Sequence, residues 1–245
     1  MSIEYSRLSI VFEDQEILVI NKPCGLIVNR SLTSPTNTLQ DMLYTHLGIL
    51  ESTTAAQDTD FYARAGIVHR LDKDTSGVLI VAKTPTTFAA LQKQFKDRLV
   101  QKEYVAIVHG NITDALIEID APLIRNPLNR LKYAIGKEGK PAFTKIVKET
   151  SIEIESNNFC FVTVFPKTGR THQIRVHLAA IKHPIVGDKI YATRKQLELA
   201  AKYFDRMMLH AKKLVIFHPL TAQRMEFTAE VPKEFYDYCP GQKNH

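Results

Sequence analysis

Eight short runs of β-branched and aromatic residues constrain the fold of this 245-residue chain more than any other feature. Runs of this length and composition are typical of strands. In residues 159–165 the side chains alternate, with three phenylalanines and a threonine on one face, which favours a largely antiparallel sheet. We expect strands at Leu8–Phe12, Ile17–Ile20, Val78–Ala82, Tyr104–Val108, Phe143–Val147, Phe159–Phe165, Leu214–Phe217 and Met225–Thr228.

Helical patterns are fewer than strand patterns and are scattered among them. Thr38 is a suitable N-cap for a helix, and Phe88, Leu91 and Phe95 form an i, i+3, i+7 stripe after Pro85 and Thr86. We expect helices at Leu39–Leu47, around Phe88–Phe95, at Thr171–Ile181 and at Lys195–Phe204, the last with Thr193 as its cap. This irregular mixture of strands and helices predicts an α+β fold.

Length and composition predict one domain over residues 1–245, with two intimate subdomains as the alternative. The sequence has no internal repeat, low-complexity tract or long Gly/Ser linker. An excess of 32 Lys and Arg over 26 Asp and Glu favours a polyanionic partner such as nucleic acid. With no dedicated interface signature, a monomer is expected.

The cysteines and the N-terminal sequence indicate in which cellular compartment the protein is found. Cys24, Cys160 and Cys239 are widely spaced and form no CxxC pair, so neither a disulfide framework nor a zinc site is predicted. The N-terminus has no signal-peptide pattern, and no apolar run reaches the roughly 20 residues that a membrane helix needs. We therefore expect a cytosolic protein that does not bind a membrane.

Two polar stretches predict loops. Glu51–Asp60 is apolar-poor apart from its alanines, which indicates an exposed loop. Arg125–Pro141 is rich in turn formers and cations and predicts a mobile surface loop. Such a basic loop either grips RNA backbone or is simply solvated, and the second case is commoner.

The most informative segment is His69-Arg70-Leu71-Asp72-Lys73-Asp74-Thr75-Ser76-Gly77, which directly precedes an apolar strand. Taken alone, it fits a polar turn in which Asp72 or Asp74 makes only an Asx-turn. Two further segments carry chemistry-bearing residues: Lys102-Glu103-Tyr104, and Thr168-Gly169-Arg170-Thr171-His172-Gln173-Ile174-Arg175-Val176-His177-Leu178.

These three segments, in this order, resemble the H-R-L-D-x-x-T-S-G, K-x-Y and TGRxHQIRxHL elements of the RluA-type family of RNA pseudouridine synthases. Every fixed position of the first element is met. Weaker similarity extends over nearly the whole chain, at Asn21–Leu26, Gly187–Tyr191, Leu209–Ala211 and His218-Pro219. The resemblance implies a catalytic fold with a central mixed, mainly antiparallel sheet, flanking helices and an RNA-binding cleft.

The resemblance implies that Asp72 is the catalytic carboxylate of a cofactor-free isomerase acting on ribosomal or transfer RNA. Asp74 is the competitor within the same loop, but its position varies in the family signature. A carboxylate suits a reaction at a sugar anomeric carbon, as nucleophile or as stabiliser of an oxocarbenium ion. A buried carboxylate needs a nearby cation to keep its charge, and the resemblance implies Arg175 as that partner. A surface cation on an amphipathic helix is the other reading of Arg175.

Two more residues take roles from the resemblance. Tyr104, expected at the head of its strand, would stack on the target base and direct its hydroxyl toward C5, although strands also favour Tyr for packing alone. An unperturbed phenol, with a pKa of about 10, is a poor base at neutral pH, so stacking is the stronger expectation. Arg70 would fill the space that the flipped nucleotide leaves, or contact a phosphate.

The remaining expected site residues contact RNA or support the base pocket. Lys22 either approaches an RNA phosphate or pins its own loop, and His69 and His172 are structural or RNA-contacting, with no metal triad near either. Ile174 and Leu209 line or support the pocket. The full set of expected RNA or substrate contacts is Arg70, Lys22, His69, Arg170, His172, Gln173, Ile174 and Leu209.

Two other classes of function compete with the isomerase. A non-catalytic RNA-binding protein could keep the fold, but Asp72, Tyr104 and Arg175 are all present. A nucleoside or glycoside hydrolase would commonly need a second carboxylate opposite Asp72. Glu103 is the nearest acidic candidate, and strand alternation should turn it away from the side that Tyr104 faces. Because the Asn-Lys-Pro element begins at residue 21, we also expect no separate N-terminal RNA-binding domain.

Overall fold

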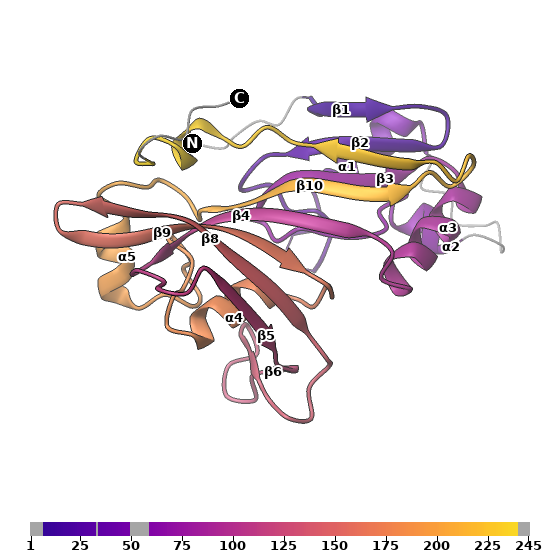
Figure 1. Ribbon diagram of the computed structural model, residues 1–245. Helices are drawn as coiled ribbons and strands as arrows, with labels where there is room; N and C mark the ends of the chain where they lie inside the picture. The colour runs from indigo at the N-terminus through magenta and orange to yellow at the C-terminus, as the bar shows by residue number, and fades with distance from the viewer. Residues whose placement is uncertain (1–6, 33, 50–58, 240–245) are drawn as a thin grey trace. The chain divides into compact units, whose positions relative to one another are not determined.

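The computed structural model describes residues 7–32, 34–49 and 59–239 of the chain. These residues form two compact units (Figure 1). The first contains the described residues up to 101 together with 213–229, and the second contains residues 102–212 and 230–239. Strand β10 (Leu209–Phe217) crosses the boundary, so its first half belongs to the second unit and its second half to the first.

The first unit is built around antiparallel strands. Its strands are β1 (Ile10–Glu13), β2 (Ile17–Lys22), β3 (Ser76–Ala82), the second half of β10, and β11 (Arg224–Thr228). β2 pairs with both β1 and β3, and β11 pairs with β10. Every residue of β3 is buried. This agrees with the unbroken apolar run of its last five residues, 78–82.

Three helices belong to this unit: α1 (Leu39–Leu47), α2 (Thr59–Ala63) and α3 (Pro85–Lys96). Thr38 and Asp41 form a capping box that satisfies backbone N–H groups at the start of α1. Thr84 caps α3, and Pro85 follows at the first helical position, where its missing N–H costs nothing.

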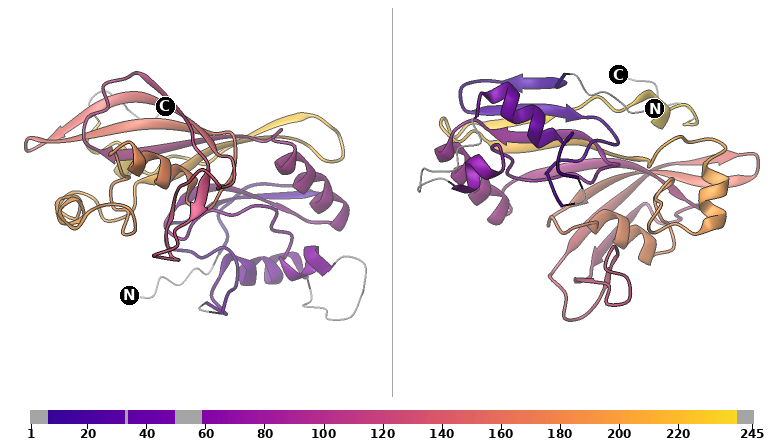
Figure 2. Two further views of the ribbon diagram at one scale, coloured as in Figure 1. Left: turned by 90° about the horizontal axis from the view of Figure 1, so that it is seen from below. Right: turned by 180° about the vertical axis from the view of Figure 1, so that it is seen from behind.

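The second unit holds a longer antiparallel arrangement. Its main strands follow the order β10, β4 (Gln101–His109), β9 (Asn157–Pro166), β8 (Phe143–Ile154) and β5 (Leu116–Asp120). β6 (Leu123–Arg125) and β7 (Tyr133–Ile135) form a separate small hairpin. Helix α4 (Gln173–Ala180) lies beside the strands, as the view from behind in Figure 2 shows, and α5 (Arg194–Ala200) and a short 3₁₀ helix (Lys233–Phe235) complete the unit.

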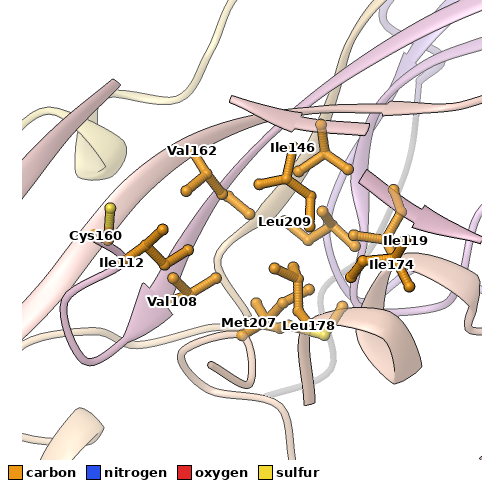
Figure 3. Packing of buried hydrophobic residues seen from close by; sticks show 13 residues of the cluster. Val108, Ile112, Ile119, Ile146, Cys160, Val162, Ile174, Leu178, Met207 and Leu209 are labelled. Carbon is orange, nitrogen blue, oxygen red and sulfur yellow. The ribbon is translucent and has the colours of Figure 1, made fainter. Parts of the chain in front are cut away.

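The alternation of residues 159–165 sorts its side chains into two hydrophobic clusters. Phe159 and Phe161 join one cluster, whereas Cys160, Val162 and Val164 join the other (Figure 3). Both faces of β9 are therefore covered, which explains why the even positions carry apolar residues as well.

The eight expected strands are confirmed, and six of them have small shifts at their ends. β8 continues beyond Val147 to Ile154, and β10 begins at Leu209 instead of Leu214. β5, β6 and β7 were not expected. β7 lies inside Arg125–Pro141, so the prediction of a continuous loop there was wrong. Of the expected loop at Glu51–Asp60, residues 51–58 lie outside the described residues, and Thr59 and Asp60 begin α2.

Helices were expected in the right places but too long at two ends. α4 begins at Gln173 instead of Thr171 because His172 has φ 57°, a left-handed conformation that cannot continue a helix. α5 ends at Ala200, which leaves Phe204 to pack into the cluster around Phe159. Among the described residues, no helix is long and apolar enough to cross a membrane.

One buried histidine gives the fold a specific pH dependence. The side chain of His109 is buried beside the ring of Phe159, and its Nε2 has no hydrogen-bond partner among the described residues. Burial lowers the pKa of His109 from 6.5 to about 4. The unfolded chain therefore takes up a proton at a higher pH than the folded chain does, and stability that is present above pH 6.5 is lost as the pH falls toward 4.

We expect this histidine to contribute a loss of about 3 kcal/mol in the free energy of unfolding across that interval. His109→Leu should flatten the corresponding part of the pH profile while leaving stability near neutral pH unchanged or higher. Urea unfolding at several pH values measures both curves. Parallel curves for the two proteins would show that His109 does not titrate in this way.

Candidate active site

The loop that carries Asp72 connects α2 to β3. Leu71 anchors it with a side chain that is only 4% exposed, whereas Arg70 is exposed and Asp72 is half-buried. The N–H of Thr75 donates to the carbonyl of Asp72 at 3.1 Å and closes a turn before β3 begins. Gly77 has φ 114°, a backbone conformation that residues with a side chain rarely adopt. A glycine is therefore favoured at this position because of the backbone conformation.

Lys22 fastens this loop from the end of β2. Its ammonium donates to the carbonyls of Pro23 at 2.8 Å, Leu26 at 2.9 Å and Lys73 at 3.1 Å, and the residue is 0% exposed. The N–H of Gly25 donates to the same Lys73 carbonyl at 2.9 Å. Of the two roles expected for Lys22, these contacts fit the pinning of the loop, because a fully buried ammonium has no surface with which to meet a phosphate.

Lys22→Met should destabilise the protein by about 2 to 3 kcal/mol, because hydrogen bonds from a charged group are worth about 1.5 to 3 kcal/mol and are not additive. The control is Lys73→Met, whose side chain is exposed and whose backbone carbonyl survives. That change should stay within about 0.5 kcal/mol of the wild type. Urea unfolding compares the two variants, and equal midpoints would contradict the pinning role.

Further contacts hold the Asp72 loop in place. The Cys24 thiol contacts the carbonyl of Asp74 at 3.1 Å. His69 Nε2 accepts a hydrogen bond from the N–H of Ile80 at 3.1 Å, and its ring stacks on Phe95 with centroids 4.7 Å apart. These contacts are structural, which is one of the two roles expected for His69. Within the described residues, no three His, Cys, Asp or Glu side chains gather as metal ligands.

In the second unit, Arg175 lies on α4 and forms a buried ion pair with Asp188. Its Nε donates to Oδ2 of Asp188 at 2.7 Å, and its Nη2 donates to Oδ1 at 2.8 Å. Arg175 is 6% exposed and Asp188 is 0% exposed. The reading of Arg175 as a surface cation is therefore wrong, and two parallel hydrogen bonds fix the plane of its guanidinium.

Asp188 is itself fixed by the backbone around it. Its Oδ1 accepts from the N–H groups of Ile190 at 2.9 Å and Tyr191 at 3.2 Å. Gly187 precedes it with φ 76°, and a Cβ there would lie 2.3 Å from the carbonyl oxygen of Arg206. The glycine thus allows the close backbone approach that places Asp188 beside Arg175.

Tyr191 links this pair to His172. The Arg175 guanidinium lies over the Tyr191 ring at 5.2 Å from its centroid. The Tyr191 hydroxyl accepts from the N–H of Tyr133 at 2.8 Å and lies 2.9 Å from Nδ1 of His172. His172 is thereby held at the start of α4, and these contacts are again of the structural kind.

Gln173 lies in a buried polar network instead of on the surface. Its Nε2 donates to the Phe143 carbonyl at 2.9 Å and to the Thr144 hydroxyl at 3.0 Å. Its Oε1 accepts from the Thr168 hydroxyl at 2.6 Å and from the N–H of Arg170 at 3.0 Å. Gln173 is 4% exposed, so its geometry favours holding the 168–170 turn over direct contact with RNA.

Tyr104, Ile174 and Leu209 meet at one hydrophobic cluster. Ile174 and Leu209 are buried members of this cluster (Figure 3). The half-buried Tyr104 packs against the cluster. Tyr104 is the fourth residue of β4 and not its head, because the strand begins at Gln101. The adjacent Glu103 pairs with Lys212 at 2.9 Å, in agreement with its expected orientation away from Tyr104.

The structure brings some of the expected site residues together within each unit. Tyr104 and Arg175 belong to the second unit and Asp72 to the first, so the pairing of Asp72 with Arg175 stays a prediction. Asp188, the ion-pair partner of Arg175, was not predicted. The Gly187-Asp188 dipeptide was recognised in the sequence as part of a weak family element, and that was the available signal.

The model of the RNA pseudouridylate synthase family matches residues 16–180, which include the Asp72 loop, Tyr104 and Arg175. The chain belongs to the RNA pseudouridine synthases. It is therefore an isomerase that converts uridine in RNA to pseudouridine, and its α+β fold is that of this family.

Relatives over nearly the full chain agree with this assignment. The ribosomal large subunit pseudouridine synthase D of Zymomonas mobilis is 40% identical over 93% of this chain and 70% of its own length. The protein of the same name from Escherichia coli is 36% identical over 94% of this chain and 69% of its own length. Among solved structures, human RNA pseudouridylate synthase domain containing 1 has a TM-score of 0.71 and 29% identity, covering 91% of this chain and 83% of that one.

Proposed function

We propose that this synthase modifies uridines in the RNA of the large ribosomal subunit. The support comes from the relatives that are named for this subunit and match at 36 to 40% identity over most of the chain. Transfer RNA is the alternative substrate. Three free cysteines suit a reducing compartment, and we place the enzyme in the cytoplasm as a monomer that uses no cofactor.

Asp72 is the proposed catalytic carboxylate. The observation that carries this role is a half-buried Asp72 in a loop that Lys22 and Cys24 hold in place and that matches the family signature. It reacts with the target uridine at either the sugar or the base. The bond from C1′ to N1 breaks, uracil rotates, and a bond from C1′ to C5 forms. The bond that Asp72 made to the uridine breaks again and restores the carboxylate, and the proton that C5 loses is balanced by one that N1 gains.

Other residues prepare this reaction. We assign Arg175 as the partner that keeps Asp72 ionised, with Asp188 as the positioning residue that fixes the guanidinium. Tyr104 stacks on the flipped base from the edge of the hydrophobic cluster. Arg70, exposed and two residues before Asp72, fills the space that the nucleotide leaves, because a planar guanidinium recovers part of the lost stacking.

The residues expected to contact RNA fall into two groups that differ in how exposed their side chains are. Arg70 is exposed and Arg170 is half-buried, so both have surface with which to meet RNA. Lys22, His69, His172 and Gln173 already hold protein groups in the two units. We assign these four residues to the support of the loops that meet RNA.

The substrate is tested with total RNA from a strain that lacks the gene. The purified protein is incubated with this RNA without added metal or cofactor, and new pseudouridines are mapped by chemical probing. New sites confined to large-subunit RNA would support the proposal. Sites only in transfer RNA would overturn the choice of substrate.

A further inference from the structure

Two cations lie beside the turn that precedes α4 and have no acidic partner there. Lys102, in β4, donates from Nζ to the carbonyl of Thr168 at 2.8 Å. Arg170 donates from Nε to the carbonyl of Pro141 at 3.1 Å and from its backbone to Gln173. Across residues 7–32, 34–49 and 59–239, neither cation forms an ion pair, and Glu103, next to Lys102 in the sequence, is paired with Lys212.

The environment of Lys102 is unfavourable for its charge. Burial, together with the nearby charge of Arg170, lowers the pKa of Lys102 from 10.5 to about 8. Two like charges held against neutral carbonyls repel each other, and a bound anion would relieve this repulsion.

Hydrogen bonds fix the turn, and the residue beside the Lys102 ammonium is a glycine. The Thr168 hydroxyl is buried between Gln173 and the N–H of Phe143, which fixes the carbonyl that holds Lys102. Gly169 is exposed, and a Cβ built there would have only the Lys102 ammonium within 4 Å, at 3.7 Å. Because position 169 has no side chain, residue 169 does not cover the ammonium.

We propose that Lys102 and Arg170 together bind one phosphate of the RNA backbone. A guanidinium and an ammonium on a fixed turn suit a phosphate, which accepts hydrogen bonds from both. The site lies at the same turn as Gln173, directly before the helix that carries Arg175. The inference rests on the proposed function, because it takes the RNA substrate as the source of the phosphate.

The test measures RNA binding as a function of salt. The probe is a labelled transcript of large-subunit ribosomal RNA, and the proteins are the wild type, Lys102→Met, Lys102→Arg and a control, Lys195→Met, on the exposed side of α5. Losing one phosphate contact should reduce the slope of log Kd against log salt by about 0.7 to 0.9. We expect this reduction and a roughly 5- to 10-fold weaker Kd for Lys102→Met, and neither effect for Lys102→Arg or Lys195→Met.

A second variant tests whether the two cations share one phosphate. Arg170→Met should weaken binding as Lys102→Met does, and the double variant should lose less than the product of the two effects. Urea unfolding checks that each variant is folded, and Lys102→Arg, which keeps the charge, should bind nearly as the wild type does.

The outcomes separate this inference from the proposed function. An unchanged salt slope in folded Lys102→Met, with modification intact, would overturn the phosphate site and leave the function standing. A fall in kcat at saturating RNA with an unchanged slope would place Lys102 in the chemistry and also overturn it. The site would be supported and the proposed function would fail if Lys102→Met had a reduced slope while the wild-type protein modified no ribosomal RNA.

Discussion

Asp72→Asn is expected to lower turnover by about 10⁴-fold or more, because the substitution removes the reacting oxygen's charge while it nearly conserves shape. Binding of RNA should stay within about 3-fold of the wild type, since most affinity for RNA comes from backbone contacts. Single-turnover release of tritium from RNA labelled at C5 of uridine measures the chemistry, and a filter-binding titration measures the affinity.

The control for this change lies in the same loop. Asp74→Asn makes the same loss of charge two residues away and keeps the carbonyl that contacts Cys24. We expect its turnover to remain within about 10-fold of the wild type. If Asp74→Asn were inactive and Asp72→Asn active, the catalytic carboxylate would be Asp74.

Asp188→Asn is expected to destabilise the protein by about 3 to 5 kcal/mol, because it leaves the charge of Arg175 buried without its carboxylate. Removal of both charges by Arg175→Met with Asp188→Leu should recover part of this loss, since no uncompensated charge then remains. Denaturant unfolding measures all three proteins.

An exposed ion pair of the same unit provides the control. Arg194 and Glu198 pair at 2.8 Å on the surface of α5, with side chains 93% and 63% exposed. Glu198→Gln should cost no more than about 0.5 kcal/mol. Equal effects of Asp188→Asn and Glu198→Gln would contradict the structural importance of the buried pair.

Local patterns explain why much of the fold was predictable. Thr38 and Thr193 each precede a helix and cap it in the structure, because a side-chain hydroxyl followed by a suitable third residue satisfies the first N–H groups. The β-branched runs identified the long strands for a similarly local reason. β6 and β7, of three residues each, were missed because such short strands carry too little pattern.

Site geometry was less predictable because it depends on contacts that are distant in sequence. Lys22 donates a hydrogen bond to the carbonyl of Lys73, 51 residues away in the sequence. Nothing in the Asn-Lys-Pro element itself predicts that contact. The left-handed conformation of His172, which sets the start of α4, is also a product of its surroundings. The motifs identified Asp72, Tyr104 and Arg175, whereas the partner role of Asp188 became visible only in the structure.

The most direct test of the central claim analyses the products of a transcript that the purified wild-type protein has treated. Nucleoside analysis by mass spectrometry should show pseudouridine formed in step with tritium release from C5, with no free uracil and no abasic site. The same treatment with Asp72→Asn should leave the RNA unchanged. Free uracil with abasic sites would instead show a hydrolase, and would contradict the account of this chain as an isomerase that acts through Asp72.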